Sequence, residues 1–305
     1  MKRLMYGLLL LSASVPASAC DVCSASTGGQ SLGMLPQLHR HFVGVQYQYR
    51  HFSSLQKGLT DASASKTSEQ YFQTMQLWGR YTVGEKIQLF GFLPYHSNAS
   101  RVDGINTIMQ GVGDATFLAN VILLKSADTA KWKHTLQAGA GVKMPLGSYK
   151  GITELEQQGL PNIQPGSASW DFPVNANYTI KYKRVGANLD ANYTITTANS
   201  DSYKFGDRLS TQLTTFYQWQ QGKVTVLPQL GMRYEYSLHN YDNYKRKWLN
   251  TQTGGTIIYA SAGAQVYYGK AGIQLSYYKP MTQQYASGNV IANSRADIGF
   301  VYLFE

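Results

Sequence analysis

Apolar and polar side chains alternate along about twelve stretches of this chain, each roughly 10–15 residues long. The clearest pair covers 170–182 and 185–195, where aromatic or aliphatic residues recur at every second position with Asn, Asp, Thr or Lys between them. A period of two places one set on each face of a β-strand, whereas a helix would scatter both sets around its axis. The pattern therefore predicts an all-β chain.

Short and long connections alternate between these stretches. Tight turns are predicted near residues 84, 183, 222 and 269 and a short one at 126–130, while long polar segments are predicted at 53–68, 97–110, 146–167, 197–206, 237–254 and 280–293. Outer-membrane barrels have an even number of antiparallel strands, short periplasmic turns and long extracellular loops. We therefore expect a transmembrane antiparallel β-barrel of about 12 strands with both chain ends in the periplasm.

Composition agrees with a barrel. The chain is only 43% hydrophobic, yet it contains 23 Tyr, 5 Trp and 11 Phe. Beyond residue 19 no apolar run approaches the roughly 20 residues that a membrane helix needs. A polar lumen combined with aromatic girdles at the two membrane interfaces accounts for both features.

The N-terminus resembles an export signal. Lys2 and Arg3 precede a short apolar run, and the small residues of 17–19 offer a cleavage site. We divide the chain into a signal peptide (1–19), a leader or plug segment rich in Cys and Gly (20–40) and the barrel (41–305). The expected location is the outer membrane of a Gram-negative-type bacterium. A lipoprotein acylated at Cys20 is the alternative, although Ala17 stands where such signals usually have Leu.

The formal net charge of +10 does not indicate nucleic-acid binding. Lys and Arg are scattered along strands and turns and form no stripe of the kind that phosphate backbones require. A basic lumen or contact with anionic lipid is the better interpretation of the excess. Two Cys are too few for a disulfide framework.

Charged residues at alternate positions are predicted to line the lumen. They are Arg50, Arg80, Asp114, Lys143, Asp171, Asp190, Arg208, Arg233, Glu235, Arg295 and Asp297. Barrels of about 8 strands have filled interiors and those of 16–18 enclose aqueous channels, so about 12 strands suggests a narrow pore. The leader (20–40) is a candidate for blocking part of it. A purely structural network of ion pairs is the competing interpretation.

The leader also carries the one metal-like grouping in the sequence. Cys20 and Cys23, with His39 and His41 downstream, offer thiolate and imidazole ligands that suit copper or zinc. A disulfide formed in the oxidising periplasm, or an acylated Cys20, would use the same cysteines differently. No other cofactor is required.

Two segments resemble a known family. The run GVGDAT at 111–116 resembles the Gly-x-Gly-Asp-(Ala or Leu)-Thr motif of the outer-membrane barrels grouped as MetA-pathway phenol-degradation (transporter-like) proteins. The run GAGVKMPLGSY at 139–149 resembles the Gly-x-Lys-x-Pro-x-Gly-x-Tyr strand end of the same family. The resemblance covers roughly 40–305 and implies an outer-membrane barrel that passes small, often hydrophobic, molecules.

The leading functional hypothesis is a transporter or channel for a small solute, with hydrophobic and metal-related solutes both compatible. The alternative is a non-conducting barrel whose leader binds metal or docks a periplasmic partner. Outer-membrane lipid and the barrel-insertion machinery are the other expected partners. We expect no enzymatic activity, because the sequence has no Gly-x-Ser-x-Gly elbow, His-Glu-x-x-His motif or phosphate-binding loop.

Overall fold

The computed structural model describes residues 41–56, 66–102, 104–127, 129–150, 163–242 and 246–304. The predicted signal peptide, the leader and its Cys20, Cys23 and His39 lie outside the described residues. Within these ranges, no helix is long and apolar enough to cross a bilayer.

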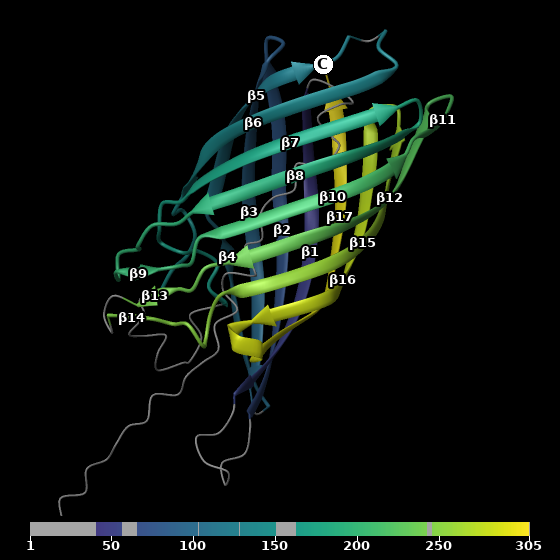
Figure 1. The fold of residues 1–305 in the computed structure, drawn as a ribbon. Coiled ribbons are helices and arrows are strands. Elements are labelled where there is room, and N and C mark those ends of the chain that lie inside the picture. Colours follow the sequence, from purple (N-terminus) through teal and green to yellow (C-terminus); the bar gives the residue numbers. More distant parts are fainter. Residues whose placement is uncertain are drawn as a thin grey trace, which may run out of the picture.

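The described residues form one closed antiparallel barrel (Figure 1). Its wall consists of β1 (His41–Gln56), β2 (Lys66–Val83), β3 (Ile87–Val102), β4 (Ile105–Val112), β5 (Ala115–Lys125), β6 (Trp132–Met144), β7 (Phe172–Tyr182), β8 (Val185–Ile195), β10 (Arg208–Tyr217), β11 (Trp219–Gln221), β12 (Val224–Ser237), β15 (Gly255–Tyr268), β16 (Ala271–Tyr285) and β17 (Val290–Phe304). The first and last strands close the wall, with His41 opposite Phe304.

Two of the wall strands are interrupted. Both β4 and β5 pair with β3, and both β10 and β11 pair with β12. Counting each interrupted pair as one strand reduces the 14 wall elements to 12. The predicted all-β, 12-stranded antiparallel barrel is confirmed.

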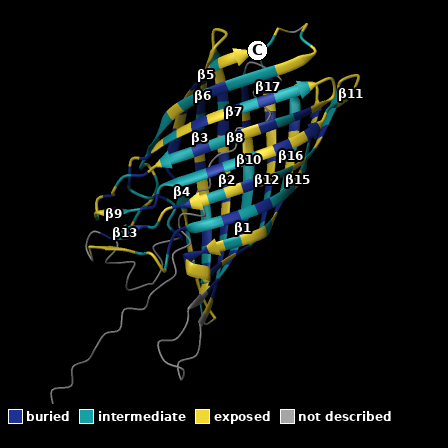
Figure 2. Cartoon of the chain, in the orientation of Figure 1, coloured by how far each residue is buried: buried dark blue, intermediate teal, exposed yellow. Residues whose placement is uncertain are grey.

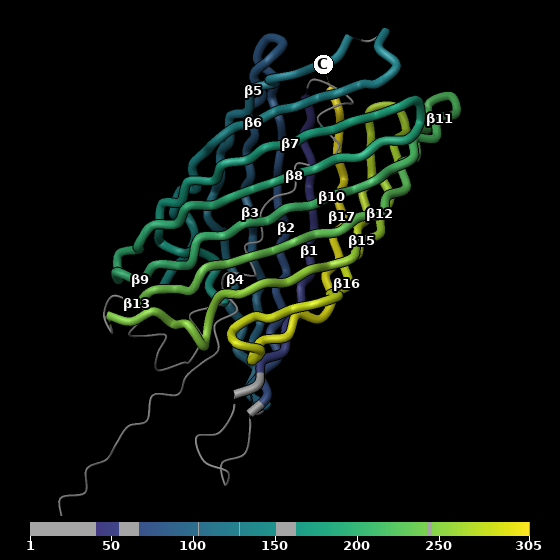
Figure 3. The backbone as a smooth tube through the Cα atoms, viewed as in Figure 1, coloured from purple at the N-terminus to yellow at the C-terminus, as the bar shows by residue number. Residues whose placement is uncertain are grey.

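The ends of the barrel differ as predicted. Figure 3 shows the tight turns β2–β3, β5–β6, β7–β8, β11–β12 and β15–β16 at the same end as the C-terminus. The opposite end carries the long connections, including a small sheet of β9 (Tyr203–Lys204), β13 (Tyr241–Asp242) and β14 (Lys247–Trp248). We call these the turn end and the loop end.

Two segments predicted to be loops are mostly strand. In 97–110, β3 continues to Val102 and β4 starts at Ile105, and in 280–293 strands β16 and β17 flank the single turn η3 (Ala286–Gly288). The prediction of long loops there was wrong. Backbone pairing continues towards the loop end in a region where lipid no longer enforces a strict alternation of apolar and polar residues.

The outer surface of the wall is apolar. Residues at alternate positions, such as Val45, Leu77 and Phe300, are about half exposed although they are large hydrophobic side chains. Their neighbours in sequence point inwards and are buried, which produces the chequered exposure in Figure 2. Such a continuous apolar belt fits contact with lipid, because in water this large apolar surface would stay exposed to solvent.

Candidate functional site in the barrel lumen

The inward-facing positions of β1 define three layers along the barrel axis. From the turn end they are Phe42, then Gln46, Gln48 and Arg50, then Phe52. Strand β2, paired with β1, repeats the order: Trp78 lies near the turn end, Gln76 and Thr74 lie in the middle and Phe72 lies near the loop end. The lumen is thus polar in the middle and aromatic on both sides.

Each aromatic side belongs to a buried cluster drawn from strands around the barrel. The turn-end cluster comprises Phe42, Trp78, Phe90, Phe92, Leu118, Phe216, Leu227, Tyr267, Val301 and Leu303. The loop-end cluster comprises Phe52, Phe72, Ile163, Ile257, Tyr259, Tyr278, Tyr285, Ala286, Val290 and Ala292. Ile163 is the member of the loop-end cluster that comes from the β6–β7 connection, and it is fully buried. The described part of that connection that begins at Ile163 therefore folds into the lumen.

Two cavities lie between the clusters. The larger, of about 130 Å³, is lined by Arg50, His96, Asp114, Lys143 and Arg208 and by the segment 164–167. The smaller, of about 60 Å³, is lined mainly by amide side chains, which are Gln46, Gln48, Gln76, Asn188, Gln212, Gln229, Gln265 and Gln274. Gln48 and Gln76 line both cavities, so the two adjoin. A polar space of this size holds several water molecules.

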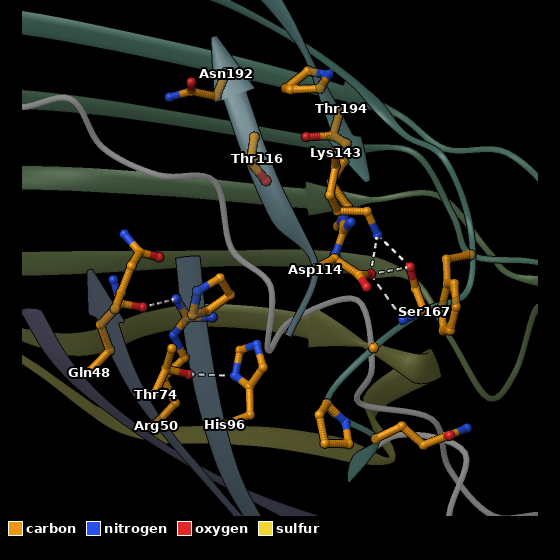
Figure 4. Close-up of a pocket in the computed structure, with 18 of the residues that line it drawn as sticks. Gln48, Arg50, Thr74, His96, Asp114, Thr116, Lys143, Ser167, Asn192 and Thr194 are labelled. Atoms are coloured by element: carbon orange, nitrogen blue, oxygen red, sulfur yellow. Dashed lines mark hydrogen bonds and ion pairs between the residues drawn. The ribbon is translucent and has the colours of Figure 1, made fainter. Parts of the chain in front are cut away.

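Asp114 organises the wall of the larger cavity. Its carboxylate accepts hydrogen bonds from the backbone N–H of Gly147 and Ser167, each at 3.0 Å, and from the Ser167 hydroxyl at 2.6 Å. The Lys143 ammonium lies 3.0 Å away from the same carboxylate (Figure 4). One side chain therefore fixes both ends of the connection that enters the lumen.

The break between β4 and β5 places Asp114 there. Gly113 donates its N–H to the Pro94 carbonyl at 2.8 Å, and a Cβ at Gly113 would lie 2.5 Å from the His96 ring. Only glycine lets the backbone approach so closely. Asp114 follows as an unpaired position, and its side chain binds the backbone amides of the connection.

Lys143 joins Asp114 to a second carboxylate. Its ammonium is 2.7 Å from Asp171, and Asp171 is 3.8 Å from the Arg208 guanidinium. We call Asp114, Lys143, Ser167, Asp171 and Arg208 the anchor cluster. Lys143 also lies 2.5 Å from the Ser167 hydroxyl.

A second ionic group crosses the polar layer. Glu235 lies 2.5 Å from Arg233 and 3.2 Å from Arg295, and Arg295 lies 2.9 Å from Asp297. Arg50 is buried beside them and donates to Gln48 at 3.0 Å. We call Arg50, Arg233, Glu235, Arg295 and Asp297 the brace cluster. It links β12 to β17 across the two strands that separate them in the sheet.

Nine of the eleven predicted lumen residues thus belong to these two clusters, and two lie apart. Arg80 is buried at the turn end, with its guanidinium 5.3 Å from the Phe42 ring centre. Asp190 accepts hydrogen bonds from Asn177 at 2.9 Å and from Asn192 at 2.5 Å. Both side chains are buried inside the barrel.

Sequence reasoning missed His96, Ser167 and the glutamines that line the cavities. His96 forms a 2.9 Å hydrogen bond with Thr74. The alternation predicts that Gln48 and Gln76 face inwards. It does not indicate whether an inward-facing side chain lines a cavity or is packed against others. No signal indicated that the β6–β7 connection enters the lumen.

His41, the described member of the predicted metal group, has other contacts. Its Nδ1 accepts the Thr82 backbone N–H at 3.1 Å, and its ring stacks on Tyr81 at 4.5 Å between centroids. Among the described residues, no three His, Cys, Asp or Glu side chains gather closely enough to hold a metal ion. The copper or zinc site remains a prediction about the leader.

No family model and no curated protein matches this sequence. The fold resembles a solved outer membrane channel from Pseudomonas putida F1, with a TM-score of 0.65 and 16% identity over 88% of this chain and 96% of that chain. The fold is that of an outer-membrane β-barrel. Two further structures resemble it less. The translocator domain of autotransporter NalP from Neisseria meningitidis has a TM-score of 0.45 and 10% identity over 94% of this chain and 100% of that chain. The CymD monoaromatic hydrocarbon channel has a TM-score of 0.43 and 9% identity over 95% of this chain and 98% of that chain.

Proposed function

We propose that this outer-membrane barrel is a narrow channel that carries a small organic solute into the periplasm. The observation that carries the proposal is the pair of adjoining cavities inside the barrel, which both have Gln48 and Gln76 in their lining. A barrel with only a structural lumen has no need for polar space between two apolar clusters. The similarity in fold to a channel supports the same conclusion.

The lining of the path favours a solute with polar groups on an apolar body. The larger cavity combines charged side chains with Pro94, Leu118 and Phe205, and the smaller one presents neutral amides. Amides donate and accept hydrogen bonds, so they accommodate varied polar groups. The aromatic clusters at both ends accept the apolar part. These features fit the family that the 111–116 and 139–149 motifs resemble, to which we assign the chain as part of this proposal.

Passage requires side chains to move. Both clusters pack buried aromatic rings across the lumen, and Ile163 is fully buried among those at the loop end. Small rotations of the rings, or displacement of residues 163–167, would join the cavities to either side of the membrane. We therefore propose gated rather than freely open passage.

The test uses two tryptophan substitutions on the same strand. Gln48→Trp would fill the junction of the two cavities, whereas Val45→Trp faces lipid and leaves the lumen untouched. We expect Gln48→Trp to abolish most of the solute-dependent liposome swelling and planar-bilayer conductance, and Val45→Trp to leave both near wild type. Heat-modifiability on gels checks that both variants fold.

A further variant covers the case in which the purified wild-type barrel passes no solute. Ile163→Ala removes the side chain that the connection inserts into the loop-end cluster, and it should increase solute passage. If the wild type and Ile163→Ala both fail to pass any solute, the channel proposal is wrong. The barrel would then serve as a structural or partner-docking protein, the alternative that the leader suggests.

A further inference from the structure

Positive charge is concentrated at the turn end of the barrel. The five turns and their flanking strand ends contain nine basic residues, which are Lys86, Lys125, Lys131, Lys133, Lys181, Lys183, Arg184, Lys223 and Lys270, against Glu85 and Asp128. These give +7 of the chain's formal +10. Asp128 lies outside the described residues. Apart from the half-buried Lys181, the nine are exposed.

Six of the nine gather on two neighbouring turns. We call Lys125, Lys131, Lys133, Lys181, Lys183 and Arg184 the basic patch. The turns adjoin because β6 pairs with β7, with Trp132 opposite Tyr182 and Lys133 opposite Lys181. Lys133 and Lys181 alternate with Trp132 and Tyr182 along their strands, so they lie on the lumen side of the wall, where the Lys181 ammonium donates a hydrogen bond to Gln218. Lys131, Lys183 and Arg184 are exposed residues of the turns themselves.

The patch lies at the membrane interface. Trp132 and Tyr182 face outwards at the ends of their strands, 53% and 37% exposed, and their ring centroids are 4.7 Å apart. Lys183 lies over the Tyr182 ring at 5.4 Å. Trp and Tyr at strand ends mark the level of the lipid headgroups. The cations beside them are therefore at the height of the headgroup phosphates.

Arg184 extends the same arrangement to the next strand. Its guanidinium is 3.5 Å from the Tyr217 hydroxyl, on β10. Lysine and arginine around a phosphate form charge-assisted hydrogen bonds, and arginine can bind it through two parallel ones. Basic clusters beside membrane-spanning segments attract anionic lipids and lose that attraction at high salt.

We propose that the basic patch binds the headgroup of an anionic phospholipid in the periplasm-facing leaflet. The phosphate would lie between Lys131, Lys183 and Arg184, and the acyl chains would follow the apolar wall below Trp132 and Tyr182. The site orders lipid around the barrel and favours membranes that contain such lipids. This inference depends on the fold and its orientation and not on whether the lumen conducts.

The experiment compares two triple variants that remove the same number of charges. One carries Lys131→Gln, Lys183→Gln and Arg184→Gln in the patch, and the other carries Arg101→Gln, Lys150→Gln and Lys247→Gln, which are exposed at the loop end. Each protein is purified in detergent with a mixture of phosphatidylglycerol and phosphatidylcholine. Native mass spectrometry then gives the ratio of the two lipids retained. Heat-modifiability confirms that both variants fold.

We expect the patch variant to lose its preference for phosphatidylglycerol by about fivefold for each cation removed, and the loop-end variant to keep it. Arg184→Lys alone should retain most of the preference. Equal ratios in the wild type and the patch variant would overturn the proposal, and so would an equal loss in both variants. Displacement of the lipid by inorganic phosphate or glycerol phosphate at concentrations similar to that of the lipid would also overturn it, because the site would then recognise free phosphate.

Discussion

The anchor and brace clusters contain similar charges but have different partners. In the brace cluster, ion pairs join side chains on the continuous strands β12 and β17. In the anchor cluster, Asp114 binds backbone amides of the β6–β7 connection as well as Lys143. The first group therefore ties wall to wall, and the second ties a connection to the wall.

The difference shows that charge and burial alone do not separate a residue that holds a connection from one that braces the wall. What distinguishes Asp114 is the interrupted strand before it and the backbone groups around it. Buried ion pairs contribute little net stability, but removing one partner is costly. Substitutions in the two clusters should therefore have separable consequences.

The largest effect is expected for Asp114→Ala. The change removes four hydrogen-bond or ionic contacts and leaves Lys143 with a single carboxylate, Asp171. Losing one partner of a buried pair costs about 3–5 kcal/mol. Here the loss weakens the attachment of the β6–β7 connection to the wall. We expect faster proteolysis within 163–171 and a higher conductance.

The conservative control is Asp114→Asn. It keeps an oxygen that can accept one of the backbone N–H groups but loses the charge next to Lys143. Its proteolysis rate should fall between those of the wild type and Asp114→Ala. Unchanged proteolysis in the alanine variant would show that Asp114 does not hold the connection.

Glu235→Gln should lower the stability of the barrel without freeing the connection. It leaves Arg233 and Arg295 without a shared carboxylate, a loss of about 3 kcal/mol for a buried pair. Unfolding by urea in lipid vesicles measures the change, and proteolysis within 163–171 should match that of the wild type. Combined with Asp114→Ala, the two effects should add. Strong coupling would contradict two independent clusters.

The sequence predicted the wall well because lipid imposes a period of two on every spanning strand. At 170–182 and 185–195 both faces were assigned from that alternation, and β7 and β8 follow it. The turns near 84, 183, 222 and 269 were found because Gly, or a two-residue basic turn, interrupts the alternation there. Gly84, Gly222 and Gly269 have positive φ, which L-residues rarely adopt.

The same reasoning failed where the lumen is apolar. The stretch 112–124 has apolar residues on both faces, since Leu118 belongs to the turn-end cluster while Phe117 faces lipid. Where inward-facing residues are apolar as well, the alternation disappears from the sequence. The break at 113–114 could therefore not be predicted. The course of the β6–β7 connection depends on tertiary contacts of Asp114, which no local pattern encodes.

The smallest predicted effect concerns Asp207, in the connection that leads into β10. Burial raises its pKa, but hydrogen bonds from the Thr196 N–H at 3.0 Å and the Thr196 hydroxyl at 2.8 Å, together with Lys204, hold the pKa below its ordinary value. Since the folded pKa is depressed, Asp207 stabilises the connection fully at neutral pH. That contribution is lost as pH falls below about 4, through the folded pKa.

Hydrogen exchange at the Thr196 amide, corrected for the intrinsic rate, measures this contribution. Its protection should decrease on acidification in the wild type, because a protonated Asp207 is a weaker acceptor. Asp207→Asn should show reduced protection already at neutral pH and little further change in acid. Equal acid sensitivity in the two proteins would mean that another group controls the connection. Since this site lies outside both lumen clusters, urea unfolding of the barrel should stay the same in this variant, which separates a local loop contact from the wall contacts of Glu235.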